Sequence, residues 1–282
     1  MNNDFPKLDI PVDFISSQNI DFEILESYTK FPCRIKSAIF FICTAGEITV
    51  TINLSDYTFK KGDFTFLIPD SFIQLQSISR EFNFSFVAFS SGFLDKNPLM
   101  QPIFELIPVL SIHPVKKLNE IEYNTQKRFF DFLAFCFSDG SYLLTDVTIQ
   151  SVFNILIEQV KATYHAHYQI DKHKMSREYQ IYMEFTLLLR NNFTSEHHLS
   201  FYADKMGLSL QHLSRVIKKM TGKNATKIID SFLLMEAKSR LKFSSAPIKS
   251  LASDIGFTNT SFFYRWFKNR MGLTPQKYRE DI

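Results

Sequence analysis

One stretch of the C-terminal third occurs twice in this sequence, and the repeat limits the possible folds more than any other feature. Ala203–Ser209 matches Ala252–Thr258 at a distance of 49 residues. After a slip of one residue the match continues at a distance of 50 residues, with Leu213–Gly222 against Phe263–Gly272. In both copies a helical pattern breaks at a glycine and then resumes, which is the plan of a helix-turn-helix. The sequence therefore predicts two such units in tandem.

The turn of each unit has residues that favour it. Gly207 and Gly256 suit the left-handed conformation that closes a helix. Ser209 and Thr258 follow two residues later, and both side chains can cap the next helix. We therefore expect Ser209 and Thr258 to start the second helix of each unit.

The second helix of each unit has an apolar and a polar face. Residues at helical spacing that should face a small core are Leu213, Val216, Ile217 and Met220 in the first copy and Phe263, Trp266 and Phe267 in the second. The outward residues are Gln211, Ser214, Arg215 and Lys218 in the first copy and Ser261, Tyr264, Arg265 and Lys268 in the second. Arg can fork onto guanine, Gln onto adenine, and Lys can neutralise phosphate. A solvated helix face is the alternative, but the matched Arg and Lys in both copies favour duplex DNA.

The segment between the copies and the charge distribution agree with that interpretation. Ala225–Phe243 reads as one helix of ~25–30 Å, close to the ~34 Å between successive major-groove faces of B-DNA. From Arg177 to the end, 17 basic residues face 9 acidic ones, a net charge of +8. The other 176 residues hold 15 basic and 20 acidic residues, a net charge of −5. A basic C-terminal part joined to an acidic remainder is typical of a polyanion-binding domain attached to something else.

The N-terminal part reads as short strands followed by helices. Between residues 35 and 90, apolar and polar residues alternate from Ile48 to Ser55, and turn signals follow at Ser55-Asp56 and Lys61-Gly62-Asp63. This pattern predicts a barrel or a sandwich. Two apolar helical stripes predict a helical hairpin at about 120–164. We expect domains at 1–165 and 177–282, with 166–176 as the linker.

The second copy and its surroundings resemble a known family. Ala252–Phe257, Ser261–Lys268 and Gly272–Arg279 look like the signature of AraC/XylS-type transcription regulators. The resemblance covers about residues 180–280. It implies a seven-helix domain that activates or represses transcription at bacterial promoters, with RNA polymerase as a partner. It also implies base-reading side chains at the following positions: Gln211, Ser214, Arg215, Thr260, Ser261, Tyr264, Arg265 and Lys268. Thr260 and Tyr264 depart from the family's usual glutamine and small residue, so an operator sequence is not carried over.

The N-terminal part is similar, more loosely, to the cupin-like sensor domains of that family. Ala45–Val50 through Lys61-Gly62-Asp63 to Pro69 has their rhythm of strands and turns, which implies a cupin-like β-barrel. Five phenylalanines suit either a plain core or a ligand pocket, and core is the commoner outcome: Phe40, Phe64, Phe66, Phe84 and Phe86. Whether this domain binds a small effector therefore stays open. The hairpin at about 120–164 lies against the barrel or pairs with a second chain, and we favour a homodimer.

Several classes of site are not supported by the sequence. Residues 35–90 contain no histidine, which argues against the metal site of metal-binding cupins. His197-His198 and the linker histidines have no Cys or carboxylate spaced to complete a zinc site. Cys33, Cys43 and Cys136 are too irregularly spaced for a disulfide framework and are expected to pack as small apolar groups. No phosphate loop, nucleophile elbow or membrane span is present, and we expect a cytoplasmic protein without a cofactor, metal or catalytic site.

The sequence thus predicts an α+β protein with an N-terminal cupin-like barrel and helical hairpin, and a C-terminal all-α domain. Its predicted function is sequence-specific DNA binding by two helix-turn-helix units joined by a long helix. Two alternatives are kept: a cupin-type small-molecule-binding protein or enzyme with a helical appendage, and a non-specific DNA-binding protein.

Overall fold

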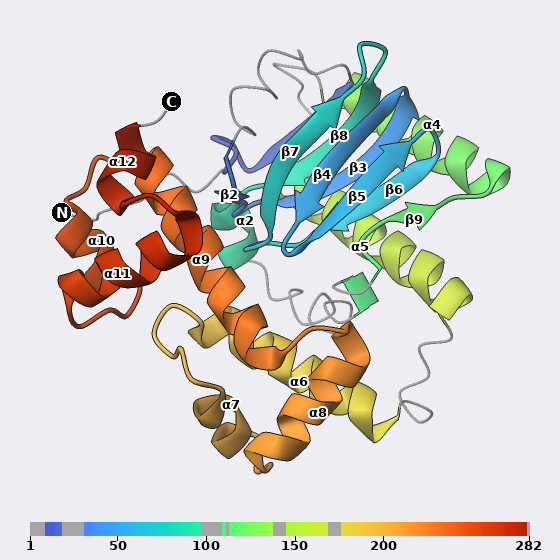
Figure 1. Ribbon diagram of the computed structural model, residues 1–282. Coiled ribbons are helices and arrows are strands. Elements are labelled where there is room, and N and C mark those ends of the chain that lie inside the picture. The colour runs from blue at the N-terminus through green and yellow to red at the C-terminus, as the bar shows by residue number, and fades with distance from the viewer. Residues whose placement is uncertain are drawn as a thin grey trace. The chain divides into compact units, whose positions relative to one another are not determined.

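The computed structural model describes residues 9–18, 31–96, 109–110, 113–137, 145–168 and 176–280. These residues form two compact units, one of strands and helices up to residue 168 and one of helices from residue 176 (Figure 1). The strands are β1 Phe14–Gln18, β2 Cys33–Arg34, β3 Ala38–Ala45, β4 Glu47–Ile52, β5 Ser55–Lys60, β6 Asp63–Leu67, β7 Phe72–Ile78, β8 Asn83–Phe89 and β9 Lys116–Lys117. The helices of the first unit are α2 Ser91–Asp95, α4 Glu120–Cys136 and α5 Asp146–Tyr168. Those of the second are α6 Arg177–Asn192, α7 Leu199–Lys205, α8 Leu210–Thr221, α9 Ala225–Phe243, α10 Ile248–Asp254, α11 Thr260–Met271 and α12 Pro275–Glu280.

The strands of the first unit form two antiparallel sheets. One sheet has the order β1-β8-β3-β6-β9, and the other has the order β2-β7-β4-β5. In the first sheet Phe40 lies opposite Phe66 on one side and Val87 on the other, which sets the register of the central strand. Neighbouring residues of a strand point to opposite faces, so each apolar strand of this sheet serves two cores.

One core lies between the two sheets and the other lies between the first sheet and the helices. The ring of Phe41 in β3 packs edge-on against Phe59 in β5, at 5.3 Å between centroids. On the opposite face, Phe40 stacks on Phe66 at 4.4 Å, and Phe89 meets Phe153 of α5 at 4.9 Å. The five phenylalanines of the sequence prediction are all buried: Phe40, Phe64, Phe66, Phe84 and Phe86.

The predicted barrel is wrong, because the two sheets do not close on each other among the described strands. The first sheet ends at β1 and β9 and the second ends at β2 and β5, and no described strand pairs the one with the other. Alternation along a strand predicts which side chains are buried, but it does not specify which edge strands pair. The turn expected at Ser55-Asp56 is also wrong. Those residues open β5, and the turn lies at Asn53-Leu54, where Asn53 has a φ of 55°.

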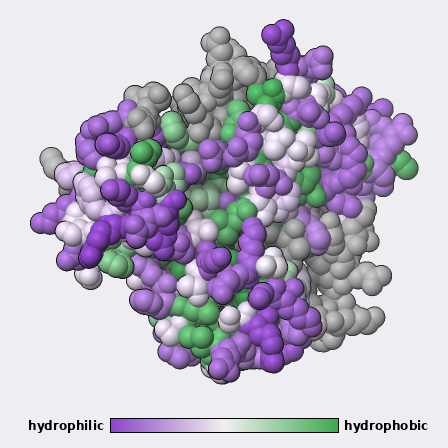
Figure 2. Space-filling model, in the orientation of Figure 1, coloured by the Kyte–Doolittle hydropathy of each residue, from purple (hydrophilic) through white to green (hydrophobic). Residues whose placement is uncertain are grey.

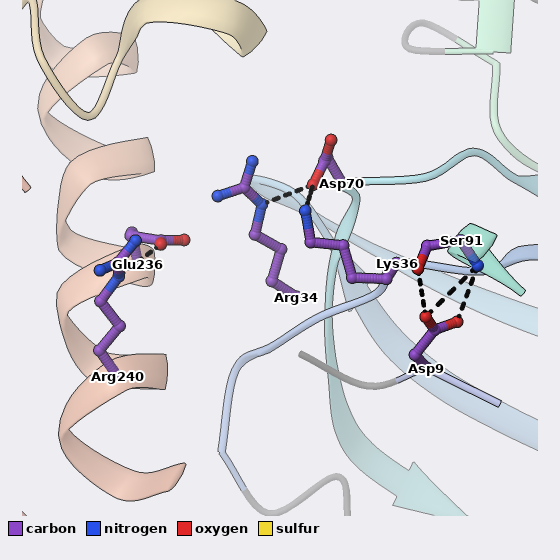
Figure 3. A network of polar contacts seen from close by, with 7 residues as sticks. All are labelled: Asp9, Arg34, Lys36, Asp70, Ser91, Glu236 and Arg240. Atoms are coloured by element: carbon purple, nitrogen blue, oxygen red, sulfur yellow. Dashed lines mark hydrogen bonds and ion pairs between the residues drawn. The ribbon is translucent and has the colours of Figure 1, made fainter. Parts of the chain in front are cut away.

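Polar side chains tie the loops of the sheet unit together (Figure 3). Oδ1 of Asp70 lies 2.9 Å from Nε of Arg34 and 3.1 Å from the ammonium of Lys36, forming an ion pair with each. Asp9 accepts from the backbone N–H of Ser91 and from its hydroxyl. These contacts fix the entry into β3 and the start of α2.

Helices α4 and α5 occupy the range in which the hairpin was predicted. The residues between them, 138–144, lie outside the described residues, as do residues 169–175 of the predicted linker. Helix α5 continues to Tyr168, past the predicted end of the hairpin at 164. Exposed apolar side chains lie on both helices: Ile121, Phe132 and Phe135 on α4, and Val147 and Ile155 on α5. None of the described helices is both long enough and apolar enough to cross a membrane.

The helical unit is organised around α9, which connects the two helix-turn-helix units (Figure 1). Its buried residues include Ile228, Ile229, Leu233 and Leu241. A charged pair is also buried in this helix, since Glu236 accepts from Nε of Arg240 at 2.6 Å and their side chains are 3% and 11% exposed (Figure 3). Arg240 also lies 3.8 Å from Asp254 of α10. The pair therefore connects α9 to α10, which is the first helix of the second helix-turn-helix.

Candidate nucleic-acid interface

The two turns of the repeat have the same backbone hydrogen bonds. In the first, the N–H of Leu208 donates to the carbonyl of Ala203 at 2.9 Å, and in the second Phe257 donates to Ala252 at the same distance. The glycine before each donor has a positive φ, 62° at Gly207 and 84° at Gly256. The left-handed glycine that the sequence predicted is therefore present in both copies.

The second turn is packed more tightly than the first. A Cβ placed on Gly256 would lie 2.6 Å from the carbonyl oxygen of Thr194 and 2.9 Å from Nε2 of His197, whereas one on Gly207 would meet nothing within 4 Å. Nε2 of His197 donates to the carbonyl of Ile255 at 2.9 Å. Burial lowers the pKa of His197 from its ordinary value. The loop before α7 thus packs against the turn of the second helix-turn-helix.

The first reading helix, α8, begins where the sequence predicted. Ser209 is its N-cap, with Oγ accepting from the N–H of His212 at 3.2 Å, and Gly222 closes it with a φ of 70°. Leu213, Val216 and Ile217 are buried, so the opposite face of α8 is turned to solvent.

The second reading helix, α11, has the same plan but a different cap. Asn259, and not Thr258, is the N-cap, because its side chain accepts from the N–H groups of Ser261 and Phe262. The asparagine side chain reaches those orphan donors from the position directly before the helix, which leaves Thr258 one residue too early. Phe263 and Phe267 are buried, and Gly272 ends the helix with a φ of 72°.

The predicted contact residues lie on the outer faces of these two helices. Six of them are exposed, namely Gln211, Arg215 and Lys218 on α8 and Ser261, Arg265 and Lys268 on α11. Three are partly buried: Ser214, Thr260 and Tyr264. The surface over α10, α11 and α12 is largely hydrophilic (Figure 2). Each helix thus presents an arginine and a lysine one turn apart on a solvent-facing side.

Neighbouring side chains hold part of this set in place. Nη2 of Arg215 donates to Nδ1 of His212, one turn earlier on α8, at 3.0 Å. The ring of His212 thus lies beside the Arg215 guanidinium. Lys219 donates to both carboxylate oxygens of Glu178 in α6, at 2.7 and 2.9 Å.

Two apolar residues at the starts of the reading helices were not in the predicted set. Leu210 is 49% exposed at the first position of α8, and Phe262 is 54% exposed at the third position of α11. Phe262 occupies the position of His212 in the repeat, 50 residues later. That register was the signal that could have marked Phe262 as outward-facing.

Metal chemistry finds no support in the part of the chain that the structure describes, where no three His, Cys, Asp or Glu side chains gather to hold an ion. Cys33 and Cys43 are buried, Cys136 is half-buried, and none of the three forms a disulfide among the described residues. Burial and the nearby carboxylate of Asp63 raise the pKa of Cys43 to about 11. This thiol is therefore protonated and unreactive at neutral pH.

Comparison with known proteins locates relatives of the helical unit. A family described as a helix-turn-helix domain matches residues 202–281. The multiple antibiotic resistance protein MarA of Escherichia coli is 35% identical over 91 residues, which cover 32% of this chain and 72% of MarA. The HTH-type transcriptional activator RhaS of Mannheimia succiniciproducens is 33% identical over 91 residues, and the chain spans only 34% of its length.

A solved structure extends over more of the chain at lower similarity. ToxT from Vibrio cholerae covers 95% of this chain and 98% of its own, with 15% sequence identity and a TM-score of 0.44. A similarity at this level establishes no shared ligand or activity.

Proposed function

Because the chain belongs to the AraC/XylS family of DNA-binding transcription regulators, which are not enzymes, we propose that its helical unit binds duplex DNA by inserting α8 and α11 into successive major grooves. One observation carries this proposal. Arg215 and Lys218 on α8 recur as Arg265 and Lys268 on α11, after two turns with matching hydrogen bonds. A solvated helix face needs no such recurrence, whereas two reading helices need the same chemistry twice.

We assign each side chain the part of the duplex that its chemistry fits. Arg215 and Arg265 read guanine, and Gln211 reads adenine. Lys218 and Lys268 neutralise phosphates, which adds affinity without sequence preference. The smaller hydroxyl-bearing residues contact base edges or phosphates: Ser214, Thr260, Ser261 and Tyr264. The exposed Leu210 and Phe262 suit the methyl group of thymine.

Helix α9 sets the distance between the two reading helices. Its 19 residues span ~28 Å at ~1.5 Å per residue, somewhat less than the ~34 Å of one DNA turn. Because α8 precedes α9 and α11 follows it in the chain, this length is close enough to one DNA turn for both reading helices to bind one side of a single duplex. The proposed target is therefore a pair of short elements about one helical turn apart.

We assign the sheet unit to dimerisation and to control by an effector. Support for a dimer comes from the apolar side chains exposed on α4 and α5, above all Phe132 and Phe135. A homodimer would bind two adjacent pairs of elements and gain affinity through effective concentration. In a bacterial cytoplasm such a regulator would act on RNA polymerase at the promoters it binds.

The dimer is tested by sedimentation of the full chain. Phe132→Ser combined with Phe135→Ser should convert the dimer to a monomer, because two exposed aromatic rings are removed from the proposed contact. Val12→Ser is the control, since Val12 is also 51% exposed in the sheet unit and should leave the dimer intact. An unchanged dimer in the Phe variant would exclude this face.

DNA binding is tested by selecting bound duplexes from a random pool at near-physiological salt, with the full chain and with residues 177–282. Two enriched elements about one turn apart would support both reading helices. Enrichment by residues 177–282 alone would support control by the sheet unit. Retention of DNA by both proteins without enrichment, with a steep salt dependence, would replace the proposal by non-specific binding.

A further inference from the structure

The second reading helix is joined to α9 by three side chains, of which the sequence predicted only Trp266, as an inward-facing residue. Arg270 lies in the last turn of α11, Trp266 one turn before it, and Asp230 in the second turn of α9. Nε of Arg270 donates to Oδ2 of Asp230 at 2.5 Å and Nη2 donates to Oδ1 at 2.6 Å. Nε1 of Trp266 donates to the same Oδ1 at 3.0 Å. Both oxygens of the carboxylate are thus engaged by α11.

The Arg270 guanidinium is held on its other sides as well. It lies 4.6 Å from the centre of the Trp266 ring, and Nη1 donates to the carbonyl of Trp266 at 3.0 Å. A bidentate arginine–carboxylate pair fixes direction as well as distance, and stacking on an indole removes further freedom from the guanidinium. Trp266 itself is 8% exposed, so its ring is set in the core of the unit. The orientation of α11 on α9 is therefore fixed at this end.

The first helix-turn-helix also has an ion pair at the end of its reading helix, but this pair is more exposed. Lys219, in the last turn of α8, donates to Glu178 on α6, the helix that precedes α7. One ammonium serves both oxygens there, and the two side chains are 63% and 40% exposed, against 32% for both Arg270 and Asp230. An exposed lysine pair restrains little, because a long side chain and a point charge can follow a moving partner. The ion pair at the end of the reading helix is thus bidentate and partly buried in the second copy, but is made by a single exposed ammonium in the first.

We propose that Asp230, Arg270 and Trp266 form a positioning clamp that fixes α11 on α9 and thereby sets the spacing at which the two reading helices accept their DNA elements. The inference rests on the proposed function. The clamp residues act through α11, and the guanidinium of Arg270 is committed to Asp230. A reading helix that is held rigidly keeps the second element at high effective concentration once the first is bound.

The test uses the full chain and the duplex enriched by the wild-type protein, together with duplexes in which the two elements are moved closer or further apart by one base pair. Asp230→Asn keeps an acceptor for Trp266 but removes the ion pair. Glu178→Gln is the matched control, because it removes the same charge from the same unit at the more exposed ion pair. The emission of Trp266, the one tryptophan of the chain, and the urea midpoint report whether each variant is folded.

We expect Asp230→Asn to bind the enriched duplex about tenfold more weakly and to lose most of the preference for the native spacing. Its binding to a duplex that holds only the element bound by α8 should change less than twofold. The Glu178→Gln control should keep the preference for the native spacing. A folded Asp230→Asn protein with unchanged spacing preference would overturn the clamp. Should this variant be unfolded, Arg270→Lys replaces it, since lysine keeps the charge but cannot fork. Failure of the wild-type chain to enrich any element would instead refute the proposed function.

Discussion

Replacing Gly256 with alanine places a methyl group where the second turn has no room for one. The added Cβ would lie 2.6 Å from the backbone oxygen of Thr194 and 2.9 Å from His197, whose ring bonds to Ile255. Gly207 is the matched position in the first turn, with a similar φ and nothing within 4 Å of the added atom. The two variants therefore share the backbone strain and differ in the clash.

The expected magnitudes follow from these two contributions. A non-glycine residue in the left-handed region destabilises the folded state by ~1–2 kcal/mol. Alanine also lowers the entropy of the unfolded chain, which offsets ~0.4–1 kcal/mol of that loss. Gly207→Ala should therefore lower the free energy of unfolding by about 1 kcal/mol. At Gly256 the oxygen of Thr194 belongs to the backbone and cannot swing aside, so overpacking adds ~1–3 kcal/mol. Gly256→Ala should lower the free energy of unfolding by about 2–4 kcal/mol.

The assay is thermal and urea unfolding followed by the emission of Trp266. Its ring lies 5.0 Å from that of Phe257, directly after the turn, so the signal reports the affected region. A difference of ~2 kcal/mol between the variants corresponds to roughly 8 °C or more in Tm for a unit of this size. Equal midpoints for Gly256→Ala and Gly207→Ala would show that the second turn tolerates the methyl group. That result would refute the argument from close packing.

Three further predictions concern DNA contacts and pH. Arg265→Ala should weaken binding by ~1–3 kcal/mol and relax selectivity at one base position, which a repeated selection would detect; an equal loss on every sequence would remove Arg265 from the reading set. Lys218→Ala should weaken all duplexes alike and reduce the slope of log K against log salt by about 1, and a loss confined to one sequence would contradict its role at phosphate. Burial lowers the pKa of His197, so the folded protein binds fewer protons than the unfolded chain near the ordinary value of ~6.5. The urea midpoint reported by Trp266 should therefore fall as pH drops from 7.5 to 5.5, and His197→Gln should reduce that dependence; an unchanged slope in the variant would assign the effect to other groups.

The sequence predicted the helical unit better than the sheet unit because its evidence there was local. Turn glycines, caps and helical stripes are decided by residues within a few positions of one another, so Gly207, Gly256 and Ser209 have the conformations or contacts expected of them. Even so, the cap of α11 moved by one residue to Asn259, since threonine and asparagine are both acceptable caps and the sequence does not rank adjacent candidates.

Contacts between distant residues could not be predicted in the same way. The barrel prediction was wrong because sheet closure depends on which edges pair, and the turn expected at Ser55-Asp56 was wrong because both residues also fit a strand. Asp230 and Arg270 are 40 residues apart, and neither spacing nor composition joins them. The polar face of the reading helices was predicted from spacing, but Phe262 was omitted because apolar residues were assumed to face inward.

Through Arg240, the buried Glu236–Arg240 pair joins α9 to α10, so a change in the length of α9 would move the whole second helix-turn-helix. One inserted residue would rotate everything beyond it by about 100° and advance it by ~1.5 Å. One base pair of B-DNA, by contrast, rotates about 34° and advances ~3.4 Å. About three base pairs would be needed to match the rotation, but they would overshoot the advance by almost 9 Å. In the proposed binding mode, therefore, no respacing of the two elements compensates for an altered connecting helix, and we expect the DNA targets of this protein to diverge in base sequence while their spacing stays the same.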